Sequence, residues 1–174
     1  YGSPRLLLRL EAGRRPDSSQ IEVAVHEVLL GPSDGTPCRD TNPEDAGHQV
    51  RNLIFRHAAN PAQSGAVCVW GDGALLEDVR VDDTNGRGVE VWGIQHIVRR
   101  VQTSGHGHLG IGGGCEECLI EDVTANRNNW RGHDPFWEAG GGKWVYTERT
   151  VFRRFVAREN DGPGLWLDGA SSDN

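Results

Sequence analysis

The chain has 174 residues, of which 36% are hydrophobic, and it carries a formal net charge of −7. This size fits one domain with a narrow core. Its 24 glycines exceed the usual share of about 7% and predict many tight turns. Because Lys and Arg do not cluster, the chain lacks a phosphate-binding surface, and we expect no nucleic-acid partner. No apolar stretch approaches the roughly 18 residues of a membrane span.

Residues 1–47 are expected to form an irregular N-terminal segment followed by a surface loop. Segments 6–8 and 21–25 have the apolar or alternating pattern of strands in an early, less regular coil. Segment 31–47 contains several prolines and acidic residues and is typical of a long surface loop.

A single repeat period dominates the rest of the chain. One column of apolar residues recurs at a constant interval: Ile54, Leu76, Val98 and Ile120. A column of turn-forming polar residues does the same: Asn60, Asp82, Ser104 and Asn126. A fixed period of this size means that each unit is one turn of a solenoid, which buries its apolar face by stacking on its neighbours. We expect the polar column to satisfy backbone amides at a corner rather than to bind a ligand.

The units are predicted to contain strands. Segments 67–69, 89–91, 109–111 and 165–167 alternate apolar with other residues, which is the two-residue period of a strand with one buried face. Glycine, Asn and Asp punctuate every unit, which argues against long helices. The sequence therefore predicts an all-β solenoid with coils of about 22 residues.

Three segments carry a resemblance to a known family: 76–79 (Leu-Glu-Asp-Val), 85–89 (Asn-Gly-Arg-Gly-Val) and 160–168 (Asn-Asp-Gly-Pro-Gly-Leu-Trp-Leu-Asp). They resemble right-handed parallel β-helix proteins of the pectate-lyase-like superfamily. The likeness covers residues 48–174 and implies a right-handed parallel β-helix with an insertion at about 127–143. Segment 137–143 (Trp-Glu-Ala-Gly-Gly-Gly-Lys) is similar to a bacterial sub-group of these proteins.

The resemblance implies a protein that is secreted or held in the bacterial cell envelope and that has a polysaccharide as its partner. The fold carries lyases, hydrolases, epimerases and non-catalytic surface proteins, so it leaves the activity open. Because the chain contains no methionine and stops just after a predicted strand, we expect it to be a piece of a longer solenoid. Its oligomeric state is not predicted.

The four cysteines are interpreted as structural. Cys115 and Cys118 form a lone C-x-x-C at a coil corner, which favours structural thiols or a local disulfide over a zinc site, since a zinc ribbon would need a second pair. Cys68 falls on an outward position, where we expect an exposed thiol.

Residues that alternate with the inward apolar positions must point outward. One outward column is predicted to hold Cys68, Glu90, Gly110 and Trp166, and the next is predicted to hold Trp70, Trp92, Gly112 and Asp168. Trp70 and Trp92 would then form an exposed ledge beside the glycines of 112–114, suited to the apolar faces of sugar rings. Glu90 and Trp166 would join them in binding substrate. The alternative is that the N-terminal segment or the 31–47 loop covers these tryptophans.

Segment 104–112 contains a Gly-His-Gly sequence that is similar to a segment of polygalacturonases. The other motifs of those enzymes have no counterpart in register here, so we carry over only His106, as a candidate substrate-binding residue. A histidine beside a glycine corner is more often a local hydrogen-bonding residue, and that alternative stays open.

The insertion gathers titratable side chains among aromatic ones. Glu138 or His133 is the candidate base for a lyase or epimerase acting on a uronate, with Lys143 or Arg131 neutralising the carboxylate. A hydrolase would instead pair Glu138 with Asp168 or Glu90. The structural alternative is an ion pair between Glu138 and Lys143 that pins the glycine-rich loop.

No cofactor is predicted, and calcium is left open. Calcium would need several converging oxygen ligands, and the sequence does not show whether the available carboxylates converge: Asp82, Asp83, Glu90 and Asp168. The sequence thus predicts a carbohydrate-active or carbohydrate-binding protein that engages a polysaccharide along an outward groove. The rival hypothesis is a non-catalytic surface scaffold or adhesin.

Overall fold

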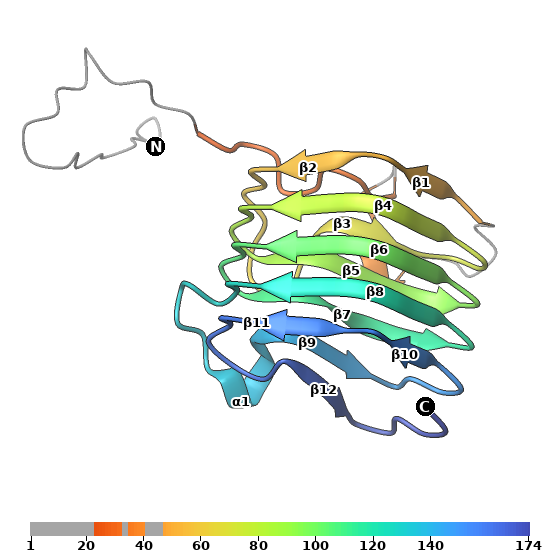
Figure 1. The fold of residues 1–174 in the computed structure, drawn as a ribbon. Coiled ribbons are helices and arrows are strands. Elements are labelled where there is room, and N and C mark those ends of the chain that lie inside the picture. Colours follow the sequence, from red (N-terminus) through yellow and green to blue (C-terminus); the bar gives the residue numbers. More distant parts are fainter. Residues whose placement is uncertain (1–22, 33–34, 41–46) are drawn as a thin grey trace, which may run out of the picture.

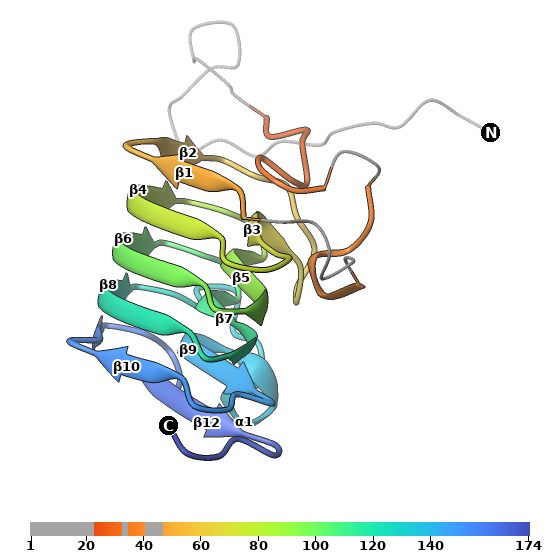
Figure 2. The ribbon, with the colours of Figure 1, turned by 90° about the vertical axis from the view of Figure 1, so that its right-hand side faces the viewer.

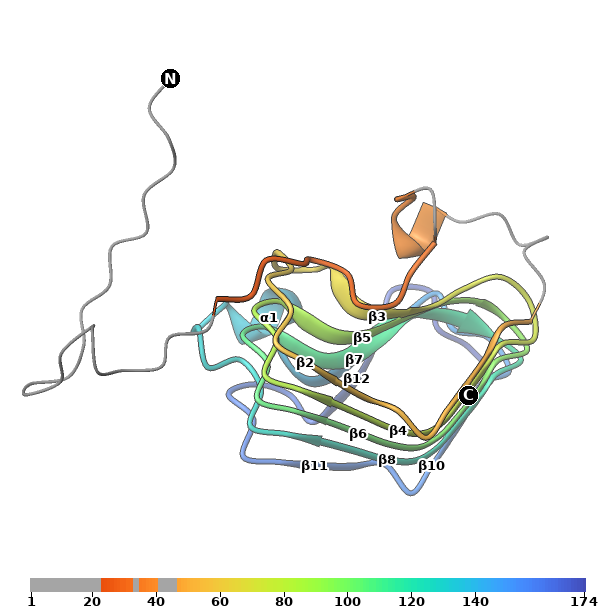
Figure 3. The ribbon, with the colours of Figure 1, turned by 90° about the horizontal axis from the view of Figure 1, so that it is seen from above.

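The computed structural model describes residues 23–32, 35–40 and 47–174, which wind into an all-β parallel solenoid (Figure 1). Two sheets face each other across the core when the molecule is seen along the stacking direction (Figure 3). The first sheet contains five strands in the stacking order β3-β5-β7-β9-β12. These strands are β3 (Gly65–Val69), β5 (Arg87–Ile94), β7 (Leu109–Glu116), β9 (Gly140–Val145) and β12 (Leu165–Asp168).

The second sheet contains seven strands and bends along its middle. Its strands are β1 (Gln49–Arg51), β2 (Ile54–Arg56), β4 (Leu75–Asp82), β6 (Ile97–Ser104), β8 (Leu119–Asn126), β10 (Val151–Arg153) and β11 (Val156–Arg158). The bend is a column of left-handed residues with φ between 52° and 56°: Asn52, Asp78, Arg100, Asp122 and Arg154. It divides the first and last coils into two short strands each.

All strand pairs are parallel, and most follow the predicted period. Leu76 pairs with Val98, and Val98 pairs with Ile120, as the apolar column predicts. The prediction for Ile54 is wrong, because Ile54 pairs with Arg80 while Val50 pairs with Leu76. In the other sheet, Val67 pairs with Val89. The segment from Val50 to Val67 is therefore longer than the equivalent segment of the next coil, from Leu76 to Val89. The first corner is therefore longer than its successor.

The third unit also differs from its predicted register. Ile111, not Leu109, pairs with Val89, so the repeat continues here without interruption. The outward column beside Glu90 therefore contains Gly112 in place of the predicted Gly110. Alternation alone did not distinguish these positions, because Leu109 and Ile111 both point inward and are both fully buried.

The core is a narrow stack of aliphatic side chains that ends in aromatic ones. Trp144 is completely buried, and its ring packs edge-on against Phe152 with centroids 5.2 Å apart. Trp144 pairs with Gly113 of the coil above, and Gly142 lies two positions before it on the same face. A Cβ at Gly142 would stand 2.9 Å from Cζ of Phe155 and 3.5 Å from Nε1 of Trp144, so the missing side chain at Gly142 leaves room for these rings.

The N-terminal part differs from prediction where it is described. Residues 23–29 form no strand, so the predicted strand at 21–25 is wrong for its described part. Leu30 makes an isolated parallel bridge with Val67 at the start of the stack. The apolar segment 6–8 lies outside the described residues. Among the described residues, no helix has the length and apolar content to cross a membrane.

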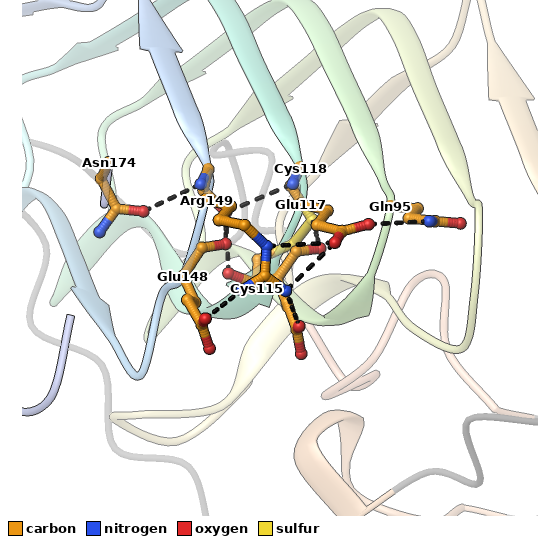
Figure 4. Close-up of polar contacts among 9 residues, drawn as sticks. Gln95, Cys115, Glu117, Cys118, Glu148, Arg149 and Asn174 are labelled. Atoms are coloured by element: carbon orange, nitrogen blue, oxygen red, sulfur yellow. Dashed lines mark hydrogen bonds and ion pairs between the residues drawn. A yellow bond between two sulfur atoms is a disulfide. The ribbon is translucent and has the colours of Figure 1, made fainter. Parts of the chain in front are cut away.

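One corner of the solenoid is closed by the predicted local disulfide, Cys115–Cys118. Beside it, Arg149 lies among carboxylates of successive coils and forms an ion pair with Glu117 at 3.1 Å (Figure 4). The prediction of a local disulfide is confirmed here. The prediction for Cys68 is wrong, because Cys68 is buried and bonded to Cys38.

Charges alternate down the bend of the second sheet. The column that follows Asn52 runs Asp78, Arg100, Asp122, Arg154, and each arginine binds the aspartate of the coil above through both carboxylate oxygens. The neighbouring column alternates in the same way: Arg51, Glu77, Arg99, Glu121 and Arg153. The arginines lower the pKa of Asp78 and of Asp122 through these hydrogen bonds. A register slip of one coil would bring like charges together, so the pattern specifies the stacking.

Reversing one charge in this column should destabilise the solenoid in a salt-dependent way. Asp122→Arg would place three cations in consecutive coils, with Arg100 above and Arg154 below, whereas the control Asp122→Asn only removes one carboxylate. We expect the melting temperature at low salt to fall in the order native, Asp122→Asn, Asp122→Arg. The gap between the two variants should narrow in 1 M NaCl, where the Debye length is about 3 Å. A gap independent of salt would contradict an electrostatic origin.

Candidate functional site

A cleft of about 280 Å³ lies over the outer face of the first sheet. It is lined by side chains from four coils, among them Arg39, Gln63, Glu90, Trp92, Glu138, Lys143 and Tyr146. Register explains the gathering, because Glu90 pairs with Gly112, and Gly112 pairs with Lys143. Three residues predicted for the site, Glu90, Trp92 and Lys143, thus reach the cleft from neighbouring strands, and Glu138 reaches it from the insertion.

Glu90 and Trp92 form a fixed unit on β5. One carboxylate oxygen of Glu90 accepts a hydrogen bond from Nε1 of Trp92 at 2.8 Å, and the other accepts one from the backbone N–H of Gly65 at 2.8 Å. The indole lies over β7, where a Cβ at Gly114 would stand 2.5 Å from Cζ3 of Trp92. The half-buried ring is therefore held at a set orientation, with a glycine beneath it that lets it approach the sheet.

Arg87 lies beneath the cleft as a buried cation with two carboxylate partners. Its Nη1 lies 3.4 Å from Oε1 of Glu90, an ion pair without hydrogen-bond geometry. Its Nη2 contacts Oε1 of Glu138 directly, and the second oxygen of Glu138 accepts a hydrogen bond from Nε2 of Gln63 at 2.7 Å. Burial lowers the pKa of Arg87, and the nearby Glu90 opposes this shift.

Lys143 is held at the opposite side of the cleft. Its Nζ lies 3.0 Å from Oδ2 of Asp168, donates to the backbone carbonyl of Trp137, and stands 4.1 Å from the centroid of the Trp166 ring. The hydrogen bond from Lys143 lowers the pKa of Asp168. The predicted ion pair between Glu138 and Lys143 is absent among the described residues, because Glu138 binds Arg87 and Lys143 binds Asp168.

The helix α1 (Pro135–Glu138) carries Glu138 to the cleft from the insertion. Asp134 caps it by accepting a hydrogen bond from the N–H of Phe136 at 2.9 Å. No residue of α1 is buried, and Phe136 is 86% exposed. The polar contacts of Glu138 and the carbonyl of Trp137 are therefore the observed links of this short helix to the cleft.

Two histidines lie behind the cleft. His108 is fully buried, and its ring meets that of His133 edge-on with centroids 4.9 Å apart. Burial, reinforced by the positive charge of Arg87, lowers the pKa of His108 to about 3, so it is neutral at physiological pH. Its Nδ1 accepts a hydrogen bond from the backbone N–H of Gln63 at 3.4 Å. His133, predicted as a catalytic base, thus packs against a buried imidazole.

Two predicted substrate-binding residues lie away from the cleft. Trp70 packs on the ring of His48, with centroids 4.0 Å apart, and so does not form a ledge with Trp92 around this cleft. His106 is completely buried and cannot contact a ligand at the surface. Its interior position agrees with the alternative of a local hydrogen-bonding residue.

His106 belongs to a column of side chains that accept hydrogen bonds from the backbone of the coil above. Nδ1 of His106 accepts from the N–H of Thr84 at 3.3 Å, Asn128 accepts from the N–H of His106 at 3.1 Å, and Asn160 accepts from the N–H of Asn128 at 3.0 Å. Of the column predicted to accept corner amides, Asn126 does so from the N–H of Arg158 at 3.1 Å, and a second ladder, not predicted, runs two positions further along through His106 and Asn128. Asn60 itself binds Gly86 and Arg87 at the longer first corner.

Replacing His106 by Asn should reduce the acid sensitivity of the fold. Burial lowers the pKa of His106 from 6.5 to about 3, so between these values the unfolded chain binds the proton more readily, and stability falls as pH falls. An Asn already accepts the equivalent hydrogen bond at positions 128 and 160. We expect His106→Asn to flatten the dependence of unfolding free energy on pH from 6.5 to 3, measured by urea denaturation.

The control is His26→Asn, since His26 lies on the exposed N-terminal segment. This variant should keep the native pH dependence. If His106→Asn and the native chain lost stability with the same slope below pH 6.5, the buried neutral state of His106 would be refuted.

A second cleft of about 410 Å³ adjoins the first and shares Arg39, Gln63 and Glu90 with it. The helix η2 (Cys38–Asp40) lies against β3 and β5 and is tied there by the Cys38–Cys68 disulfide (Figures 2 and 3). The described part of the loop around η2 thus covers the Cys68 end of the outward column, whereas the alternative stated from the sequence concerned Trp70 and Trp92 and stays a prediction. Trp92 stays half-buried at the cleft wall.

Among the described residues, one group of potential metal ligands comes together: Cys38, Cys68 and Glu90. The two sulfurs are bonded to each other in the disulfide, so they offer no thiolate. Asp82, named above as a calcium ligand, binds Arg56 and Arg80 instead. The described residues therefore assemble no metal centre of three free ligands.

Sequence reasoning did not identify Arg87, Gln63 and His108 as parts of this site. Arg87 falls in a segment that carried the fold resemblance, and nothing in its spacing indicates a buried cation.

Comparison of the chain with protein-family models, with curated proteins and with solved structures gave no match.

Proposed function

We propose that the cleft over the first sheet binds a segment of a polysaccharide. The observation that carries this proposal is Trp92, an indole fixed by Glu90 at the wall of a cleft that also contains Gln63, Glu138 and Lys143. A sugar ring has apolar C–H faces and a rim of hydroxyls. Aromatic side chains offer a large rigid apolar surface, and the carboxylates, amide and ammonium around Trp92 can exchange hydrogen bonds with hydroxyls.

The wider context supports the same proposal. A solenoid repeats its outward positions about every 4.8 Å, which favours extended ligands that lie across several coils. The two disulfides are typical of an oxidising compartment, which supports a secreted or cell-envelope protein. Within this proposal the chain is a right-handed parallel β-helix of the pectate-lyase-like superfamily.

Trp92→Ala should abolish retention of the native chain by immobilised polysaccharide. The matched control is Trp70→Ala, one repeat earlier, because Trp70 packs on His48 outside the cleft. We expect at least a tenfold loss of affinity for Trp92→Ala, in line with roughly 1–3 kcal/mol for the loss of a large aromatic contact, and little change for Trp70→Ala. Affinity electrophoresis in gels that contain a panel of plant and bacterial polysaccharides measures both.

If Trp92→Ala were retained as strongly as the native chain, the cleft would not be the binding site. If the native chain were retained by no polysaccharide of the panel, the rival hypothesis of a non-catalytic scaffold without glycan affinity would replace the proposal.

The second candidate function is hydrolysis of the bound glycan. Glu90 and Glu138 meet the same guanidinium of Arg87, so they form a pair of neighbouring carboxylates, and a carboxylate pair is what glycosidases use. Glu138→Gln keeps the shape of the side chain and removes its charge. If the protein is a hydrolase, the native chain should release reducing ends from a retained polymer, and Glu138→Gln should lower this rate by a factor of about 100 or more.

Retention without release of reducing ends by the native chain would assign binding alone. Release at equal rates by Glu138→Gln and the native chain would exclude Glu138 from the reaction.

A further inference from the structure

The charges of the cleft are already paired within the protein. Arg87 has the carboxylates of Glu90 and Glu138. Lys143 has Asp168 at 3.0 Å, and its side chain is only 12% exposed. The remaining cation is Arg39, whose Nε lies 3.7 Å from Asp40. The cleft lining contains three cations, Arg39, Arg87 and Lys143, and two carboxylates, Glu90 and Glu138, while Asp168 and Asp40 pair with Lys143 and Arg39 from outside the lining.

This pairing makes an acidic ligand unfavourable. A ligand carboxylate would have to displace Glu138 from Arg87 or Asp168 from Lys143, and separating a largely buried cation from its carboxylate is strongly unfavourable. Otherwise it could meet Arg39, an exposed cation whose 3.7 Å ion pair with Asp40 is weak, but deeper in the cleft it would lie beside Glu90 and Glu138, and such like-charge contacts are repulsive. The net charge of −7 adds a long-range repulsion of polyanions.

An uncharged hydroxyl-bearing ligand meets no such obstacle. A hydroxyl is donor and acceptor at once, so it can add hydrogen bonds to a paired carboxylate or ammonium without breaking the pair. Glu138 engages one oxygen with Arg87 and the other with Gln63, and each carboxylate oxygen has a further lone pair. Trp92 above Gly114 and the nearby Val145 supply the apolar wall.

We propose that the cleft selects an uncharged, hydroxyl-rich glycan and discriminates against polysaccharides that carry carboxylates. This inference rests on the proposed glycan-binding function and names its ligand class. It differs from the uronate chemistry that the insertion residues alone indicate, because that chemistry requires a cation free to receive the substrate carboxylate. Here the two largely buried cations of the cleft, Arg87 and Lys143, have carboxylate partners supplied by the fold.

The test compares polymers that differ only in charge. Polygalacturonate and its carboxyl-reduced galactan, and a glucuronan with its carboxyl-reduced glucan, are offered to the native chain. We expect a neutral member to be retained, its acidic counterpart to bind roughly tenfold or more weakly, and retention of the neutral polymer to change less than about twofold between 50 and 500 mM NaCl. Stronger binding of the acidic member, lost in salt, would overturn the inference and leave the proposed function standing.

A charge-releasing variant tests the cause of the discrimination. Asp168→Asn removes the carboxylate that neutralises Lys143 and keeps the side-chain shape. It should raise affinity for the acidic polymer, relative to affinity for the neutral polymer, by roughly five- to tenfold at low salt.

The matched control is Asp161→Asn, because Asp161 follows the corner residue Asn160 and does not line the cleft. It should alter neither affinity. An Asp168→Asn variant with the native preference would show that ion pairing does not set the selectivity. Failure of the native chain to retain any polymer, neutral or acidic, would overturn the proposed function and this inference together.

Discussion

Each coil hydrogen-bonds to the next in parallel and in register, and this constraint decides where most side chains lie. Equivalent residues of successive coils stand about 4.8 Å apart, so each side chain of a column must pack favourably against the side chains of the same column above and below it. Apolar columns satisfy this by interlocking, as Leu76, Val98 and Ile120 do. A charged column satisfies it only by alternating sign, as the column from Asp78 to Arg154 does. Polar corner columns satisfy it by accepting backbone N–H groups from the coil above.

The same constraint builds the cleft from residues that are distant in sequence. Glu90 and Lys143 are far apart along the chain, yet they lie two strands apart on one face, with Gly112 between them. The interval from Ile111 to its partner Gly142 is longer than the regular repeat, and the longer corner carries α1 to the rim. A Cβ at Gly112, between the two charged positions, would clash with the backbone carbonyl of Lys143, so glycine permits the close approach of the two strands. The regular stack provides the site and one irregular corner completes it.

The fold could be predicted from the sequence because the same type of residue recurs at the equivalent position of several coils. The columns from Leu76 to Ile120 carry the period, and the register follows wherever corners keep their length. The predicted register was wrong at Ile54, because the repeat does not indicate that the first corner is longer than the next. The outward columns named Glu90 and Trp92, and the insertion named Glu138 and Lys143, all of which line the cleft, but the ion pairs among them were not predicted. Pairing depends on which long side chains can reach one another, and Arg87 emerges as the partner of Glu138 only in three dimensions.

Arg87 is what couples the insertion to the sheet. Its side chain is 4% exposed, and a buried guanidinium is costly unless carboxylates surround it. Glu90 on the same strand provides one partner, at 3.4 Å and without hydrogen-bond geometry. The second must come from elsewhere, and Glu138 supplies it from a helix that buries no residue of its own. The helix is therefore held by this ion pair together with the contact of the Trp137 ring with the buried His108 ring, whose centroids lie 6.3 Å apart, and the cation gains its second carboxylate from the helix. The ion pairs that hold the helix to the sheet therefore also neutralise the buried cation of the cleft.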